Sequence, residues 1–124
     1  MHSILYKFSE RKRLWKKAVI ILKDHILYEL GGINDKVAKK STNIFGYKLE
    51  PNFDISKHTE LIISLPSPIL GQAFRLTRTH LNMKSLLLYS TETNVALKWI
   101  SELQSICNYQ KIGTVESLIK ALIK

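Results

Sequence analysis

The chain has 124 residues, 19 of them lysine or arginine and 10 aspartate or glutamate, so its formal net charge is +9. We expect one domain, which buries roughly two thirds of the surface that the unfolded chain exposes. The 45% hydrophobic content argues against disorder, and apolar runs such as AVIIL are far shorter than the ~20 residues that span a bilayer.

Short β-strands are predicted through the first half of the chain. Residues 4–8 alternate, with Ile4, Tyr6 and Phe8 on one side. Residues 15–22 and the run HILYEL at 25–30 are rich in branched residues and read as two strands that a tight turn joins. A mixed polar segment follows, and a fourth strand is predicted at 44–49, closed by Pro51 and Asn52.

Three further strands and a helix are predicted in the second half. The strands are LIISL, AFRLTRT and SLLLYS, which brings the number to seven. From Thr91, taken as a threonine N-cap, apolar residues recur at helical spacing through Val95, Trp99 and Leu103, and Trp99 is expected in the core. Residues 111–124 read as a second, short amphipathic helix, which leaves 1–110 as the main domain.

The segments LWKKAVIIL, HILYEL and TETNVALKWISEL make the chain similar to pleckstrin homology (PH) domains over about residues 3–108. This resemblance implies a mainly β fold, a seven-stranded antiparallel barrel or sandwich capped by a C-terminal helix. A narrower likeness is to the C-terminal PH domain of FYVE-containing Rho exchange factors of the faciogenital dysplasia type. It implies a module of a larger signalling regulator.

The resemblance also implies a binding pattern for phosphoinositides. Lys7 matches the family's lysine late in the first strand, and Lys16 matches the basic residue that opens the second. The following arginine of lipid-binding members is replaced by Ala18. Because a methyl group carries no charge and donates no hydrogen bond, we expect weak rather than stereospecific headgroup binding.

Two predicted loops supply further cations. Arg11, Lys12 and Arg13 follow the first strand in the stretch RKRLWKK, and Lys36, Lys39 and Lys40 follow the third. If both loops open the same way, they form one cationic rim, to which each lysine or arginine near an anionic leaflet contributes roughly 1 kcal/mol. Exposed Leu14, Trp15 or Ile33 side chains would enter the interface.

Other interpretations of this basic stretch stay open. It could be a solvated loop or a nuclear import signal, and the domain could instead bind a regulatory domain or a small GTPase. Sequence-specific nucleic-acid binding is disfavoured, because most of the cations are lysines and base reading favours arginine.

Catalytic and metal-binding patterns are poorly supported. The four histidines are dispersed, no acidic or cysteine ligand stands at metal-binding spacing from them, and no nucleophile elbow or phosphate-binding loop is present. We therefore expect a non-enzymatic protein without metal or cofactor. The single cysteine, Cys107, and the lack of a signal-peptide pattern favour a soluble, cytoplasmic protein that is peripheral to membranes.

Overall fold

A computed structural model describes residues 1–32, 34–65, 71–78 and 85–114. The elements in chain order are β1 (His2–Ser9), β2 (Leu14–Lys23), β3 (Ile26–Leu30), β4 (Lys40–Asn43), β5 (Tyr47–Phe53), the 3-10 turn η1 (Ile55–Lys57), α1 (Thr59–Ile63), β6 (Gln72–Arg78), β7 (Leu86–Ser90) and α2 (Thr93–Thr114). The expected mainly β fold with a C-terminal helix is thus confirmed.

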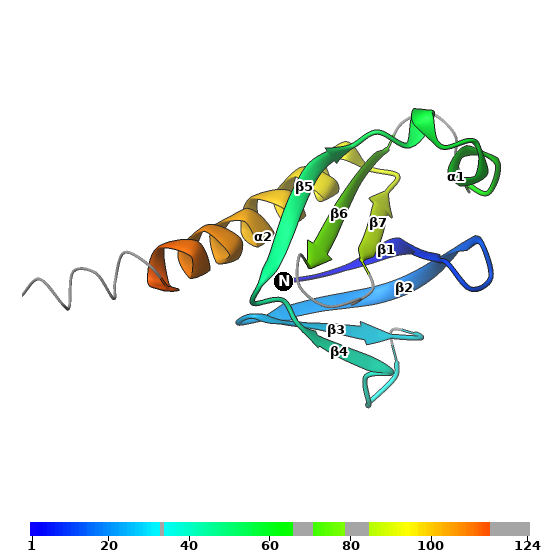
Figure 1. Ribbon diagram of the computed structural model, residues 1–124. Coiled ribbons are helices and arrows are strands. Elements are labelled where there is room, and N and C mark those ends of the chain that lie inside the picture. Colours follow the sequence, from blue (N-terminus) through cyan, green and yellow to red (C-terminus); the bar gives the residue numbers. More distant parts are fainter. Residues whose placement is uncertain (33, 66–70, 79–84, 115–124) are drawn as a thin grey trace, which may run out of the picture.

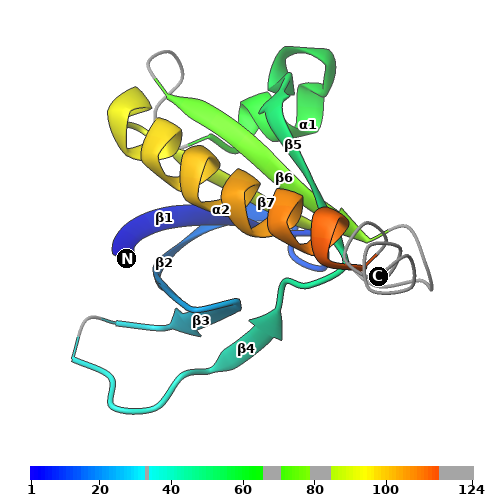
Figure 2. The same ribbon diagram turned by 90° about the vertical axis from the view of Figure 1, so that its left-hand side faces the viewer.

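The seven strands form one antiparallel sheet in the order β4-β3-β2-β1-β7-β6-β5. The sheet twists strongly, so that β5, β6 and β7 cross the direction of β1 to β4 (Figure 1). Figure 2 shows α2 lying across the half that contains β5, β6 and β7, and most of its contacts are with those three strands. The helix therefore closes one opening of the sheet, as a capping helix should.

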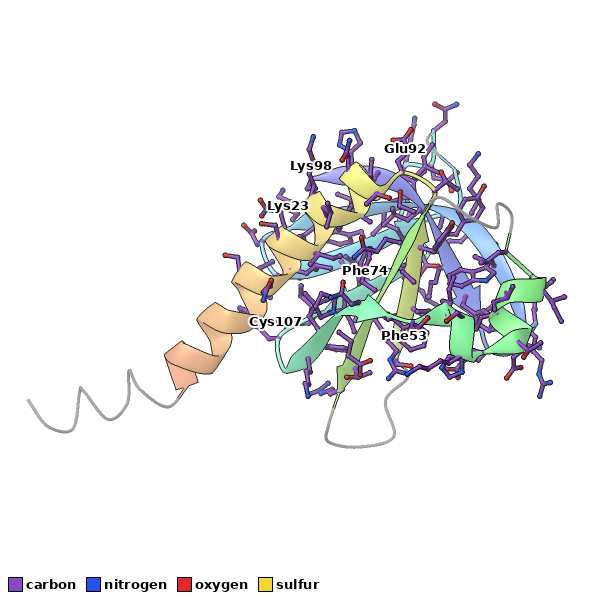
Figure 3. The ribbon with its side chains drawn as sticks, turned by 90° about the horizontal axis from the view of Figure 1, so that it is seen from above. Lys23, Phe53, Phe74, Glu92, Lys98 and Cys107 are labelled. Atoms are coloured by element: carbon purple, nitrogen blue, oxygen red, sulfur yellow. The ribbon has the colours of Figure 1, made fainter. Side chains whose placement is uncertain are left out.

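Alternation along β1 and β2 decides which residues reach the core. Leu5 pairs with Ala18, and both are buried, whereas Ile4 on the opposite face of β1 is half exposed. Leu5 and Ala18 belong to the same buried cluster as Ile20 and Phe74, and Phe74 points into the space between the sheet and α2 (Figure 3). The face that carries Leu5 is therefore the inner face.

The tryptophan of α2 lies at the centre of this core. Trp99 is 0% exposed and packs with the inner faces of both halves of the sheet. Its indole nitrogen Nε1 has no hydrogen-bond partner, so its contribution is packing alone. The helix begins at Thr93 rather than directly after Thr91, and Ser90 Oγ stabilises this entry by accepting from the Glu92 N–H and donating to the Glu92 carbonyl.

One predicted strand is wrong. The segment LIISL falls in α1 and the residues after it, and only Leu61 of the helix is buried. Short apolar runs do not distinguish strand from helix by periodicity, and here Ile62 and Ile63 are both exposed, which a half-buried strand would not allow. This run therefore carries a surface helix.

The fourth predicted strand, at 44–49, is also misplaced. The chain there forms two strands: β4, with the sequence KSTN, and β5, which continues through Pro51 and Asn52 to Phe53. Both are edge strands, so β4 needs no apolar alternation and Pro51 removes no central hydrogen bond. A register shift between Glu50 and Phe53 accompanies the proline.

The helix α2 continues to Thr114, through the predicted boundary between residues 110 and 111. The remaining residues of the predicted short helix, 115–124, lie outside the described part of the chain, as does Ile33. The independent C-terminal helix therefore stays a prediction.

Candidate functional site

The β1–β2 loop and α1 lie on the right of Figure 1; the β3–β4 loop turns on the same side but lower down, and Figure 2 shows it apart from α1. The β1–β2 loop spans residues 10–13, all exposed, and includes Arg11, Lys12 and Arg13. The Lys12 N–H donates to Ser9 Oγ at 3.3 Å, and Arg13 has a φ of 54°, which lets the chain reverse in four residues. The three predicted loop cations are thus presented together to solvent.

The two strand lysines point to the inner face beside this loop. Lys7 and Lys16 are directly opposite each other on β1 and β2, and they share the face of Leu5 and Ala18. Lys16 is exposed, but Lys7 is largely covered. The pattern implied by the family resemblance therefore places two lysines on the same face of neighbouring strands, close to the β1–β2 loop.

Lys7 is already paired within the chain. Its Nζ lies 2.8 Å from Glu29 Oε2 on β3, and the side chains of Lys7 and Glu29 are 17% and 22% exposed. A carboxylate in this position neutralises the lysine and repels a phosphate that approaches it. Ala18, buried on the same face, adds no donor. Among the described residues of β1 to β4, the inner face at this end thus offers two exposed cations, Lys16 and Lys40, the second directly opposite Glu29, where stereospecific headgroup binding would need several donors.

Sequence analysis missed Glu29. The residue lies within HILYEL, whose branched neighbours indicate a strand but not its register. The β2–β3 register pairs Ile20 with Glu29, which puts the carboxylate on the inner face. Ile20 lies seven positions after the last loop residue, Arg13, and is buried in the core, so the register of the hairpin is the signal that could have found the acidic group.

The β3–β4 loop carries its cations beside an acidic residue. The Lys39 N–H donates to the Glu29 carbonyl at 2.8 Å, and its side chain folds over Gly31, where a Cβ atom would lie 2.7 Å from Lys39 Cε and 3.1 Å from Asp35 Oδ2. Asp35 Oδ2 also accepts the Gly32 N–H at 2.9 Å. The ammonium of Lys39 therefore lies near a carboxylate, whereas Lys36 is exposed.

On the outer face, α1 is fastened to the β1–β2 hairpin. Trp15 Nε1 donates to the Leu61 carbonyl at 3.1 Å, and the Trp15 ring packs against Phe8 at 5.4 Å and Tyr89 at 5.7 Å between centroids. Trp15 is consequently half-buried and holds α1 rather than projecting into solvent. Arg13 Nη1 lies 3.9 Å from Glu60 Oε2, but both side chains are mostly exposed, so this pair stabilises little.

Two histidines are engaged in ring stacking. His25 stacks on Phe45, and His58 stacks on Phe53. Over residues 1–32, 34–65, 71–78 and 85–114, no group of three or more histidine, cysteine or acidic side chains could hold a metal ion. Neither described helix is long and apolar enough to cross a membrane.

Comparison with known proteins gives structural matches only. No family model matches the chain, and no curated protein matches it. The C-terminal PH domain of human pleckstrin is 13% identical, with a TM-score of 0.67, and the match covers 89% of this chain and 88% of that one. The same pleckstrin domain in complex with D-myo-Ins(1,2,3,5,6)P5 is 13% identical with a TM-score of 0.61, over 86% and 92% of the two chains.

The Slm1 PH domain in complex with inositol 4-phosphate gives a similar result. It is 12% identical with a TM-score of 0.64, and the match covers 86% of this chain and 94% of that one. Identities this low show the fold and not the ligand. The strand order, the capping helix and these matches agree: the chain has the pleckstrin homology fold.

Proposed function

We propose that the chain is a non-enzymatic module that attaches its parent protein weakly to anionic membranes through the cationic loop end. One observation carries the proposal: Arg11, Lys12, Arg13, Lys16 and Lys36 are exposed at the end where Lys7 is neutralised by Glu29. Binding through this end depends on summed charge and not on a pocket built for one headgroup. The inositol phosphates in the pleckstrin and Slm1 complexes support phosphorylated lipids as the ligand class.

The expected affinity for an anionic membrane follows from the number of exposed lysines and arginines. Each lysine or arginine near an anionic surface contributes about 1 kcal/mol, so four to five of them give a dissociation constant on the order of 0.1 to 1 mM. Exposed charges are screened beyond roughly 8 Å at physiological salt. The membrane attraction is therefore salt-sensitive, and it suits a domain that acts together with other domains of a larger chain.

The parent protein that we propose is a cytoplasmic signalling regulator, such as a Rho exchange factor of the faciogenital dysplasia type. The likeness of WKKAVIIL and AFRLTR to that subfamily supports this context.

Charge reversal tests the proposal. A Lys12→Glu, Arg13→Glu, Lys16→Glu triple variant should lose binding to vesicles that contain phosphatidylserine and phosphoinositides, without a change in melting temperature. The matched control reverses three exposed lysines elsewhere, Lys23, Lys48 and Lys98; Lys23 and Lys98 project on the side of α2, away from α1 (Figure 3).

The two triple variants carry the same total charge, so a general charge effect would weaken both equally. Loss confined to the loop triple supports the proposal. Binding that survives the loop triple would overturn it and would favour a protein partner, such as a regulatory domain or a small GTPase.

A further inference from the structure

The loop end exposes aliphatic side chains as well as cations. Ile62 and Ile63 of α1 are 40% and 79% exposed, and Leu14, the first residue of β2, is 55% exposed. Three of the seven exposed large hydrophobic residues of the described chain are thus in α1 or directly after the β1–β2 loop. Single exposed aliphatics are ordinary, but a group of them at one end marks an interaction surface.

The exposure of the two isoleucines follows from how α1 is held. Leu61 is buried, and its carbonyl accepts the Trp15 indole N–H, so this side of the helix faces the sheet. Successive helical residues are rotated by about 100°, which turns Ile62 sideways and Ile63 away from the sheet. Trp15 is itself packed between Phe8 and Tyr89. The two isoleucines are therefore presented by a fixed support.

The charges around these aliphatic residues indicate which class of partner this surface binds. The loop end of the β1–β2 hairpin, residues 10–17, together with residues 54–60 carries six lysines and arginines, namely Arg11, Lys12, Arg13, Lys16, Lys17 and Lys57, against three acids, Glu10, Asp54 and Glu60. Aliphatic side chains beside a cationic surplus match the interface of an anionic bilayer, where acyl chains lie directly below phosphates. An acidic lipid surface is thus the occupant that both features fit.

We propose that Ile62 and Ile63 form an insertion edge that enters the acyl region of anionic bilayers, while the cations of the β1–β2 loop contact the headgroups. This inference rests on the proposed membrane function and deepens it. It assigns the part of the binding that persists at physiological salt to α1, a helix that the sequence analysis did not predict. The choice between lipids then depends on the surface charge of the membrane and on how its lipids pack, more than on the identity of the headgroup.

An Ile62→Ser, Ile63→Ser double variant tests the insertion edge. The control is Ile4→Ser with Leu97→Ser, which removes two aliphatics of similar exposure, 50% and 49%, from β1 and α2. Partitioning of the full chain onto phosphatidylserine vesicles is measured at low and at physiological salt. We expect the α1 variant to bind at least about tenfold more weakly at physiological salt, because buried apolar area is lost, and the control to bind like the unaltered chain.

The outcomes separate the insertion edge from the proposed function. An α1 variant that binds as well as the unaltered chain, or a control that weakens equally, would overturn the insertion edge and leave the charge-reversal result standing. Failure of the unaltered chain to bind any anionic vesicle would overturn both. Quenching of Trp15 fluorescence by brominated lipids gives a second readout: the edge requires quenching in the control variant and its loss in the α1 variant.

Discussion

Replacing Glu29 by glutamine should strengthen the binding of this chain to anionic vesicles. In the native chain the Glu29 carboxylate lies 2.8 Å from Lys7 Nζ, on the inner face beside the cationic loop. The Glu29→Gln change removes one negative charge from the binding end. The glutamine amide oxygen still accepts a hydrogen bond from Lys7, so the side-chain arrangement is preserved.

The expected gain is about fivefold in affinity. One unit of charge close to an anionic surface is worth about 1 kcal/mol, and a tenfold change in affinity corresponds to about 1.4 kcal/mol. The two side chains are only 17% and 22% exposed, so removing the counter-charge of Lys7 costs stability. The retained hydrogen bond limits this loss, which we expect to be about 1 to 3 kcal/mol.

Vesicle co-sedimentation at fixed salt measures this gain. Glu102→Gln is the matched control, since Glu102 is an exposed residue of α2 and the variant has the same net charge. An affinity of Glu29→Gln that is unchanged, or raised no more than that of Glu102→Gln, would refute the conclusion that the Lys7–Glu29 pair limits binding at the inner face.

Three predictions concern the fold. Trp99→Ala should lower the free energy of unfolding by about 3 to 5 kcal/mol, whereas Trp99→Phe should cost far less because the indole N–H has no partner to lose; urea unfolding compares the two, and equal losses would contradict this. Gly71→Ala should unfold the domain or sharply lower its melting temperature, since a Cβ there would overlap the Ser90 carbonyl and the Tyr89 hydroxyl; an unchanged melting temperature would disprove the contact. Burial raises the pKa of Tyr89 from its ordinary value of 10.0, so the neutral hydroxyl stabilises the fold fully below pH 10, and this stabilisation is lost as the pH rises through the raised pKa. The free energy of unfolding of Tyr89→Phe should therefore fall less steeply above pH 10 than that of the unaltered chain. Equal slopes for the two proteins would contradict this prediction.

The elements that could be predicted are those whose packing leaves a periodic pattern. Six elements each place an apolar face on one core, and that face produces a periodic apolar pattern in the sequence. They are β1, β2, β3, β6, β7 and α2. The strand β4 lacks such a pattern because it is a polar edge strand. The strand predicted at LIISL was wrong because two of its apolar residues face solvent in α1, and no local sequence pattern reveals this exposure.

The cations of the candidate site could be predicted from the sequence, but the acidic residue that pairs with Lys7 and the contact that holds α1 could not. The loop cations Arg11, Lys12 and Arg13 follow from a hairpin turn within a basic stretch. The pairing of Lys7 with Glu29 joins residues 22 positions apart, and it depends on the register of two strand pairs. The support of α1 by Trp15 joins residues 46 positions apart. Such long-range contacts arise from tertiary packing, so the sequence pattern does not contain them.

The most direct test of the membrane proposal is binding of the chain to vesicles with equal total negative charge but different lipids. One series contains phosphatidylserine alone, and others contain single phosphoinositides at matched charge, at low and at physiological salt. We predict affinities that follow total charge, weaken as salt rises and differ little between phosphoinositides. A strong preference for one phosphoinositide that persists at physiological salt would contradict the account, because it would require a stereospecific pocket despite Ala18 and the Lys7–Glu29 pair.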